Sequence, residues 1–488
     1  MDKFIAHLIQ DKSKIRKIQI LESLIDSNEI MSSKVLSQKL KCTSRTIIND
    51  ISQLKLTLPE NWDLISIQSK GYLLKRDFSD DFSRIITPYL ISSELYKILL
   101  GIFNHKYYSL EKWSQLLYLD KLTLKKYLKN FKIILNQFSL DFNFRTLQLV
   151  GPELNIRHFY VMFFYYIQKY QRTFTLNSNL QLKIEHITRK YDIEIDYNLL
   201  TIIINVSINR ILNKDFISEN LDFKYTFCIN REKCIKAIIS KLEYFFNINL
   251  SENEVNFLKI AFFLISEGDI EEKVNITNYY YETKKKTYKH FFSLFNMISS
   301  EINVSSKTKA KIKYEIYFRL HKISLFHKYH LSIGEFGSEF GTVHQDFLEG
   351  YKIIYPHIFS WNERINENRL TKDEIYYVIY HILFVLYSNY SKKGLLLLSG
   401  SSSLKKFIYY KLNNELGGIL KLELKPDYTN KYDFILTNYQ FTSGKIPIIR
   451  ISSKTIKKDL SFIKNTISPY IKKNEYKSCI CSNSVLQK

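Results

Sequence analysis

The chain has 488 residues, of which 45% are hydrophobic and 15% aromatic, so it can bury several separate cores. Thirteen glycines and seven prolines are few for this length, which favours helices over turn-dense all-β folds. A net charge of +23 indicates a polyanionic partner, although a general enrichment in lysine would give the same number. We therefore expect a mainly α-helical, multidomain protein of about three to five domains.

The N-terminus and the longest apolar runs do not predict membrane insertion. MDKFIAHLIQDKSK lacks the apolar core of a signal peptide, and the run from Ile375 to Tyr387 is short and interrupted by His381. Five cysteines without zinc-ligand spacing fit a reducing compartment. Cys479 and Cys481 form a CxC that is either an exposed tail or a metal site, and the tail is the better interpretation. We expect a cytoplasmic protein with no membrane partner, no metal and no cofactor.

Residues 13–56 have the pattern of three short helices. The first has one apolar face, made by Ile15, Ile18, Leu21, Leu24 and Ile25. Ser32 or Ser33 can cap the second helix, in which the inward positions are Val35, Leu36 and Leu40. Lys41 and Cys42 make a tight turn, and Thr43 or Ser44 caps the third helix. This spacing is typical of a helix-turn-helix.

The third helix of this segment is the predicted recognition helix. Its inward positions are Ile47, Ile51 and Leu54. The polar side chains at its start and on its outer face are Ser44, Arg45, Thr46, Asn49 and Gln53. Such side chains can reach phosphates and base edges in the major groove of double-stranded DNA. A helical hairpin without function would explain the apolar positions, but it would not require Ser-Arg-Thr at the start of the helix.

Two alternating runs flank Ser69–Lys70–Gly71 and predict a β-hairpin. A hairpin after three such helices forms the wing of a winged helix-turn-helix. By its position, Lys70 is a further phosphate contact. The first domain therefore spans residues 1–78.

The same order of elements recurs between residues 92 and 157. Residues 109–117 resemble the supporting helix and residues 122–138 the recognition helix, and FNFRTLQLVG supplies a wing. The inward stripe of the second helix is Leu124, Leu128, Phe131 and Leu135, and its lysines are Lys125, Lys126, Lys129 and Lys132. A solvated lysine face on an ordinary helix is the alternative. The repetition favours a second winged helix-turn-helix at 85–160, with Lys125, Lys126 and Lys129 on DNA.

The segment GPELNIRHF (Gly151–Phe159) closes this second module. Glu153 and Arg157 have helical spacing, at which an ion pair contributes only ~0.5 kcal/mol. With the two helix-turn-helix patterns, this segment resembles the Mga/AtxA/RofA-like transcriptional regulators of Gram-positive bacteria. The resemblance covers nearly the whole chain and weakens toward the C-terminus.

The resemblance implies a homodimeric transcriptional activator of virulence or surface-associated genes that binds double-stranded promoter DNA. It implies two helical phosphotransferase-system (PTS) regulation domains, at 165–275 and 283–390. A small α/β domain like enzyme IIB of sugar transport would follow at 392–488. A PTS phosphocarrier protein would then donate phosphate to histidines of the regulation domains.

Each predicted regulation domain ends in a similar helix. When Glu254 is aligned with Glu374, Ala261 falls opposite His381. The pattern around His381 resembles the phosphoacceptor helix of these domains. A neutral imidazole nitrogen accepts a phosphoryl group near pH 7, and the product carries about −2 charge. The alternative is a core histidine between Tyr380 and Ile382.

A second histidine in the early helix of the domain is also typical of the family. His321 fits that place in the second domain, with His327 and His330 as alternatives. The corresponding helix of the first domain has no histidine. Asp215 lies near that position and could act as a permanent acidic substitute.

The C-terminal segment alternates between strands and helices. GLLLLSG, YDFILTN and IPIIRIS read as strands, and the segments after the first and last of them as helices. This order predicts a parallel sheet. Enzyme IIB carries its phosphoacceptor cysteine at the end of the first strand, where this chain has Ser399, so we do not expect phosphotransfer through this domain.

Two other classes compete with a DNA-binding regulator. A PTS component would be an enzyme, but the missing cysteine and the helix-turn-helix patterns argue against one, and no other catalytic motif is present. An RNA-binding antiterminator also uses paired regulation domains. Such proteins begin with a small β-rich domain, whereas this chain begins with helices.

Overall fold

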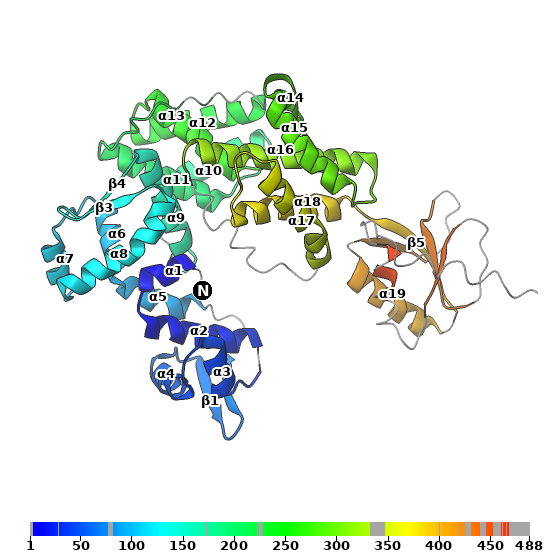
Figure 1. Cartoon of the computed structure of the whole chain (residues 1–488), viewed down its shortest axis with the longest axis horizontal. Coiled ribbons are helices and arrows are strands. Elements are labelled where there is room, and N and C mark those ends of the chain that lie inside the picture. Colours follow the sequence, from blue (N-terminus) through cyan, green and yellow to red (C-terminus); the bar gives the residue numbers. More distant parts are fainter. Residues whose placement is uncertain are drawn as a thin grey trace, which may run out of the picture. The chain divides into compact units, whose positions relative to one another are not determined.

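The computed structural model describes residues 3–27, 29–76, 82–171, 174–221, 223, 228–331, 347–399, 401–417, 419–424, 431–439, 446–451, 460, 462–464, 466 and 467. They fall into two units that divide between Glu267 and Gly268, with the short stretch Phe326–Ser332 belonging to the first unit. Helices dominate both units (Figure 1).

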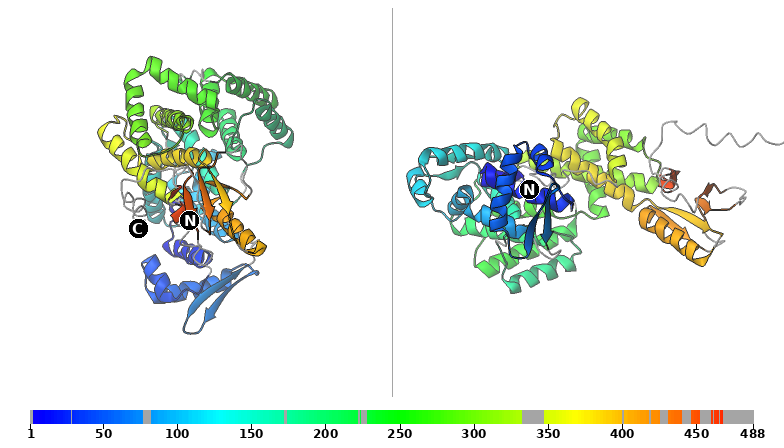
Figure 2. Two further views of the ribbon diagram at one scale, coloured as in Figure 1. Left: turned by 90° about the vertical axis from the view of Figure 1, so that its right-hand side faces the viewer. Right: turned by 90° about the horizontal axis from the view of Figure 1, so that it is seen from below.

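The first unit begins with a three-helix module and a hairpin. Its elements are α2 (Lys12–Ser27), α3 (Ser33–Leu40), α4 (Ser44–Thr57), β1 (Trp62–Ile67) and β2 (Gly71–Arg76). Their apolar faces share one core, which includes Leu21, Leu36, Ile47 and Trp62. The antiparallel hairpin extends past the helices in both Figure 1 and Figure 2. This module is the expected first winged helix-turn-helix.

The second module repeats the order of the first. Its elements are α5 (Ser83–Ser92), α6 (Glu94–Phe103), α7 (Leu110–Leu116), α8 (Lys121–Gln137), β3 (Asp141–Asn143), β4 (Gln148–Val150) and α9 (Glu153–Ile167). Helix α1 (Lys3–Ile9) packs into this module although it precedes the first one. Its Phe4 ring contacts Phe131 of α8 and Phe163 of α9, and Leu8 accepts a 2.6 Å hydrogen bond from Ser93. Helix α1 also contacts α2 of the first module, so it ties the two modules together.

A helical bundle completes the first unit. It contains α10 (Ser178–Lys190), α11 (Tyr197–Leu212), α12 (Ile229–Phe246) and α13 (Glu252–Ile265). Helix α11 packs on both α9 and α13, so the bundle shares its core with the second winged module.

The second unit contains another bundle and the sheet. The bundle helices are α14 (Ile270–Thr283), α15 (Lys285–Ser299), α16 (Ser306–Lys328), α17 (Leu348–Arg364) and α18 (Lys372–Ser388). Helix α14 packs against α15, and for this reason the division between units lies at 267–268. The sequence predicts the boundary between the two regulation domains at 275–283, and that boundary stays a prediction.

The C-terminal sheet has the strand order β6-β5-β7-β8, with all strands parallel. Its elements are β5 (Lys392–Leu397), α19 (Ser402–Leu416), β6 (Leu420–Glu423), β7 (Phe434–Thr437) and β8 (Ile448–Arg450). Ile408 and Leu412 of α19 pack with Leu396 and Leu436 of the sheet. The prediction of a parallel sheet is confirmed, although β6 was not expected. Most of the last predicted helix, with Cys479 and Cys481, lies outside the described residues.

No single described helix is long and apolar enough to cross a bilayer. Helices α5 and α6 pass that test only as a pair that bends by 72°. Ile86, Leu90, Leu99 and Ile102 of this pair are buried in the protein core.

Candidate nucleic-acid interface and regulatory site

Side-chain N-caps mark the start of α3 and α4. Ser32 is the N-cap of α3, since its side chain accepts a 3.2 Å hydrogen bond from the Val35 amide. Lys41 ends the helix in a left-handed conformation, and Thr43 caps α4 through the Thr46 amide. These caps fix the turn between the two helices. The inward position predicted for Val35 is wrong: its side chain is 46% exposed.

Helix α4 is held by an apolar stripe and one buried ion pair. Ile47, Ile51 and Leu54 are all buried, as predicted. Asp50 is 4% exposed and binds the guanidinium of Arg16 on α2, with Nη2 at 3.2 Å from Oδ1. The hydrogen bond to Asp50 raises the pKa of Arg16. Both contacts fix the rotation of α4 about its axis, and with it the outer face.

That outer face carries the predicted DNA-contacting side chains. Arg45, Asn49 and Gln53 are exposed and follow one another at intervals of four residues, so they form one line along the helix. Ser44 and Thr46 are half-buried. Their hydroxyls already have local partners, because Ser44 donates to Ser37 at 3.4 Å and Thr46 lies 2.8 Å from the Thr43 hydroxyl.

The wing places Lys70 at its tip. Strands β1 and β2 pair from Trp62↔Arg76 to Ile67↔Gly71, and the turn between them contains Ser69 with a φ of 60°. Gly71 has a φ of 135°, and a Cβ there would lie 2.3 Å from the Met31 carbonyl oxygen. Only glycine lets the hairpin pack this closely.

Beside that tip lies an open recess of about 460 Å³. Exposed Lys70 lines it with Ser32, Ser33, Ser66, Gln68 and other residues of the wing. Side chains that donate hydrogen bonds therefore surround the space between the wing and the start of α3.

The second helix-turn-helix matches the first at a constant interval of 77 residues. Ser109 caps α7 as Ser32 caps α3, and Asp120 caps α8 as Thr43 caps α4. Tyr118 has the left-handed conformation of Lys41. The two modules are therefore copies of one backbone design.

The outer face of α8 is basic. Lys125, Lys126 and Lys129 are exposed, as predicted. Two other lysines of this helix are held by carboxylates: Lys121 by Glu111, and Lys132 by Asp141 at 2.5 Å. Lys125, Lys126 and Lys129 are therefore the lysines on this face that can bind an external anion.

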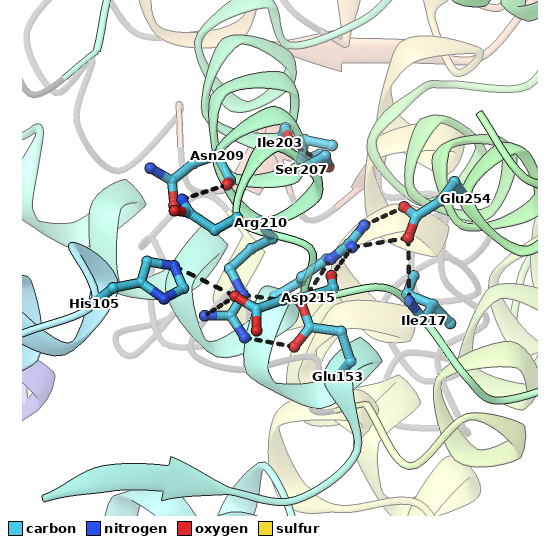
Figure 3. A network of polar contacts seen from close by, with 11 residues as sticks. His105, Glu153, Ile203, Ser207, Asn209, Arg210, Asp215, Ile217 and Glu254 are labelled. Atoms are coloured by element: carbon cyan, nitrogen blue, oxygen red, sulfur yellow. Dashed lines mark hydrogen bonds and ion pairs between the residues drawn. The ribbon is translucent and has the colours of Figure 1, made fainter. Parts of the chain in front are cut away.

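A buried ion cluster joins the second module to the bundle of the first unit (Figure 3). Arg157 on α9 is fully buried and donates to Glu153 at 2.9 Å and to Glu254 on α13, also at 2.9 Å. Arg210 on α11 donates to Glu153 at 2.7 Å and pairs with Asp215 at 3.2 Å. Burial opposes the charge of Arg210, but hydrogen bonds and the charge of Glu153 raise its pKa.

This cluster corrects the sequence analysis of Glu153 and Arg157. The weak contribution assigned to that pair applies to exposed side chains. Arg157 and Glu254 are both buried and form an ion pair, and removing one partner of such a pair costs about 3–5 kcal/mol. Asp215 belongs to the same cluster, where it lies 3.3 Å from Nε2 of His105.

His381 lies on α18 beside a buried carboxylate. Its side chain is 24% exposed, and Nδ1 is 3.8 Å from Oε1 of Glu315 on α16. Glu315 also binds Lys273 and Arg319, each at 2.6 Å. The Tyr377 ring packs edge-on against His381 at 4.7 Å. An added negative charge on His381 would therefore meet a carboxylate that two cations already bind.

His321 has a different environment. It is 8% exposed, and its Nδ1 lies 3.0 Å from the hydroxyl of Tyr280. Burial, with the nearby charges of Lys284 and Lys322, lowers the pKa of His321 to about 3. The imidazole is therefore neutral at physiological pH. The alternatives His327 and His330 lie at and beyond the end of α16, where His327 is half-buried and His330 exposed.

The predicted enzyme IIB phosphoacceptor position holds Ser399, two residues after β5 ends. Its backbone is bound by the side chain of Asn438, which accepts from the Ser399 amide and donates to its carbonyl, both at 2.8 Å. Ser401 is the N-cap of α19. Among the described residues, no group of histidines, cysteines and carboxylates could hold a metal ion.

Two winged modules with exposed recognition helices define the class of protein: a DNA-binding transcriptional regulator of the helix-turn-helix type. Residues 16–73 match the family model of the HTH domain, and residues 79–164 match that of the Mga helix-turn-helix domain.

Three relatives extend the match along the chain. The capsule synthesis positive regulator AcpB of Bacillus anthracis is 22% identical over 93% of this chain and 98% of its own. The anthrax toxin expression trans-acting positive regulator of the same organism is 21% identical over 94% and 98%. A trans-acting regulator of Streptococcus pneumoniae is 22% identical over 88% and 92%. The chain is therefore similar over most of its length to these Gram-positive regulators, and it contains a Mga helix-turn-helix domain.

Proposed function

We propose that this regulator activates transcription by binding double-stranded promoter DNA. The observation that carries the proposal is the pair of recognition helices with exposed polar and basic faces. Arg45, Asn49 and Gln53 would enter the major groove, with Ser44 and Thr46 at the start of the helix. Lys70 on the wing and the lysines of α8 would bind phosphates. Activation rather than repression is inferred from the relatives that are named positive regulators.

Titration of the purified full chain with duplex DNA tests this proposal against its RNA-binding rival. We expect the duplex to bind and an RNA hairpin of equal charge to compete weakly. Tighter binding of the hairpin would favour an antiterminator. The variant Arg45→Ala should weaken the duplex complex, because a charged contact to DNA is lost while the buried face of α4 stays intact. Lys405→Ala on α19 is the control for general loss of positive charge.

We infer that His381 is the phosphoacceptor that tunes the regulator, with a PTS phosphocarrier protein as donor. The imidazole nitrogen would attack the phosphorus of the donor's phosphohistidine, so that one P–N bond forms as the other breaks. His381 is partly exposed, whereas His321 could react only if the bundle opened. The new charge would repel Glu315 and loosen α18 from α16, and this change would alter how the protein dimerises.

A phosphotransfer assay with a labelled phosphocarrier protein tests this assignment. We expect His381→Ala to abolish incorporation into the full chain. His357→Ala is a matched control, because His357 is 27% exposed and lies 3.6 Å from Glu301 in the same unit. Sedimentation velocity of His381→Asp would measure the dimer. Label that survives His381→Ala, or disappears in His357→Ala, would contradict the assignment.

A further inference from the structure

We propose that the two recognition helices divide the work on DNA: α4 reads base edges, while α8 binds the phosphate backbone. This inference rests on the proposed DNA-binding function and deepens it. It comes from a comparison of equivalent positions in the two copies.

The N-caps and the left-handed turn residues of the two modules are all separated by the same interval of 77 residues. Each position of one module therefore has an equivalent position in the other. The inward positions keep their character, as Ile47 and Ile51 correspond to Leu124 and Leu128, all four buried. The two outer faces can therefore be compared residue by residue.

The outer line of α4 has side chains suited to base recognition. Arginine binds guanine through two hydrogen bonds in the major groove, and asparagine or glutamine binds adenine in the same way. Arg45, Asn49 and Gln53 are exposed on one face. Their neighbours on this face, Ile48 and Ser52, carry no charge. The face therefore offers hydrogen-bonding specificity with a single positive charge.

The equivalent line of α8 has lost these groups. Arg45 corresponds to Leu122, which is 75% exposed, and Asn49 corresponds to Lys126. Gln53 corresponds to Asn130, whose side chain amide lies 3.4 Å from the Gln10 side chain oxygen. The base-reading positions of the first helix are thus apolar, cationic or already in contact in the second.

Positive charge takes their place. Ile48 and Ser52 of α4 correspond to Lys125 and Lys129 of α8, both exposed. A lysine ammonium is a flexible point charge that suits phosphate oxygens, and it lacks the planar fork that arginine offers to a base. Three lysines on one helical face therefore supply affinity that depends on salt and not on sequence.

The equivalent residues Asn49 and Lys126 form a matched pair for the test. The full chain first selects a duplex from a random library, and binding is then measured on this duplex and on a scrambled one across a salt series. We expect Asn49→Ala to weaken the selected duplex about 5- to 150-fold and the scrambled duplex little, with an unchanged salt slope. We expect Lys126→Ala to weaken both duplexes equally and to reduce the slope of log affinity against log salt by about 1.

Several outcomes would overturn the division of work. Lys126→Ala changing the ratio between the two duplexes would make α8 a base-reading helix, and Asn49→Ala weakening both equally would make α4 a backbone contact. Unchanged binding in either variant would remove that helix from the interface. If the unmodified chain binds no duplex at any salt concentration, the proposed function fails together with this inference. Thermal unfolding of both variants checks that these exposed substitutions leave the fold intact.

Discussion

Helices α13 and α18 end the two helical bundles, and they begin in the same way. Ser251 and Thr371 are N-caps that accept from the amides of Glu254 and Glu374, at an interval of 120 residues. Glu374 completes a capping box with the Thr371 backbone. Glu254 instead turns to Arg157, which reaches it from the second winged module.

Because of this difference, α13 is fixed to the winged module, whereas α18 carries a partly exposed histidine. In the first unit, the shared buried ions tie the bundle to the winged module, and position 261 has only an alanine methyl group. In the second unit, the equivalent position holds His381, partly exposed beside Glu315. The same helix start therefore serves structural coupling in one bundle and, in the other, belongs to the helix with the histidine that we propose as the phosphoacceptor.

Of the substitutions that test this difference between the bundles, we expect Arg157→Met to change the free energy of unfolding most. Arg157→Met removes the cation that binds buried Glu254, whereas Glu153 keeps Arg210, so we expect the free energy of unfolding of the first unit to fall by about 3–5 kcal/mol. Urea denaturation measures it. Arg189→Met is the matched control, because Arg189 makes an i,i+4 pair with Glu185 but is 79% exposed. Equal losses in both variants would mean that the buried cluster does not support the unit.

We expect a smaller change in the stability of the second unit when the pH is lowered. The pKa of folded His321 is about 3, below the ordinary value of 6.5, so unfolding takes up a proton between these values. The stability contributed by neutral His321 is present above pH 6.5 and falls by up to about 1.4 kcal/mol per pH unit as the pH drops toward 3.

Hydrogen exchange of the α14 and α16 amides at pH 7 and pH 5, corrected for intrinsic rates, measures this loss. We expect His321→Gln to reduce the difference in opening free energy between the two pH values. The control is His186→Gln, since His186 is exposed on α10. A wild-type difference that His321→Gln leaves unchanged would contradict the account of this buried imidazole.

Local signals in the sequence predicted the recognition helices well. The apolar period of α4 and the hydroxyl caps act over a few residues, so Ile47, Ile51, Leu54 and the wing turn could be placed without the structure. The exposed lysines of α8 followed from the same reasoning.

Features that depend on distant residues could not be predicted in this way. Arg157 and Glu254 are 97 residues apart, and only the fold brings them together. Helix α1 has a short apolar face that gives no indication that it packs into the second module rather than the first. Strand β6 has four residues, too few for its alternation to stand out from the loop around it.

DNA binding by the winged modules is tested by the duplex titration of the full chain, repeated across a salt series. We expect log affinity to fall linearly with log salt, and Arg45→Ala to bind more weakly than the unmodified chain while Lys405→Ala does not. Binding lost in Lys405→Ala but kept in Arg45→Ala would move the polyanion contact to the basic C-terminal segment. The absence of duplex binding at low salt would contradict the assignment of the winged modules as the DNA-binding part of this protein.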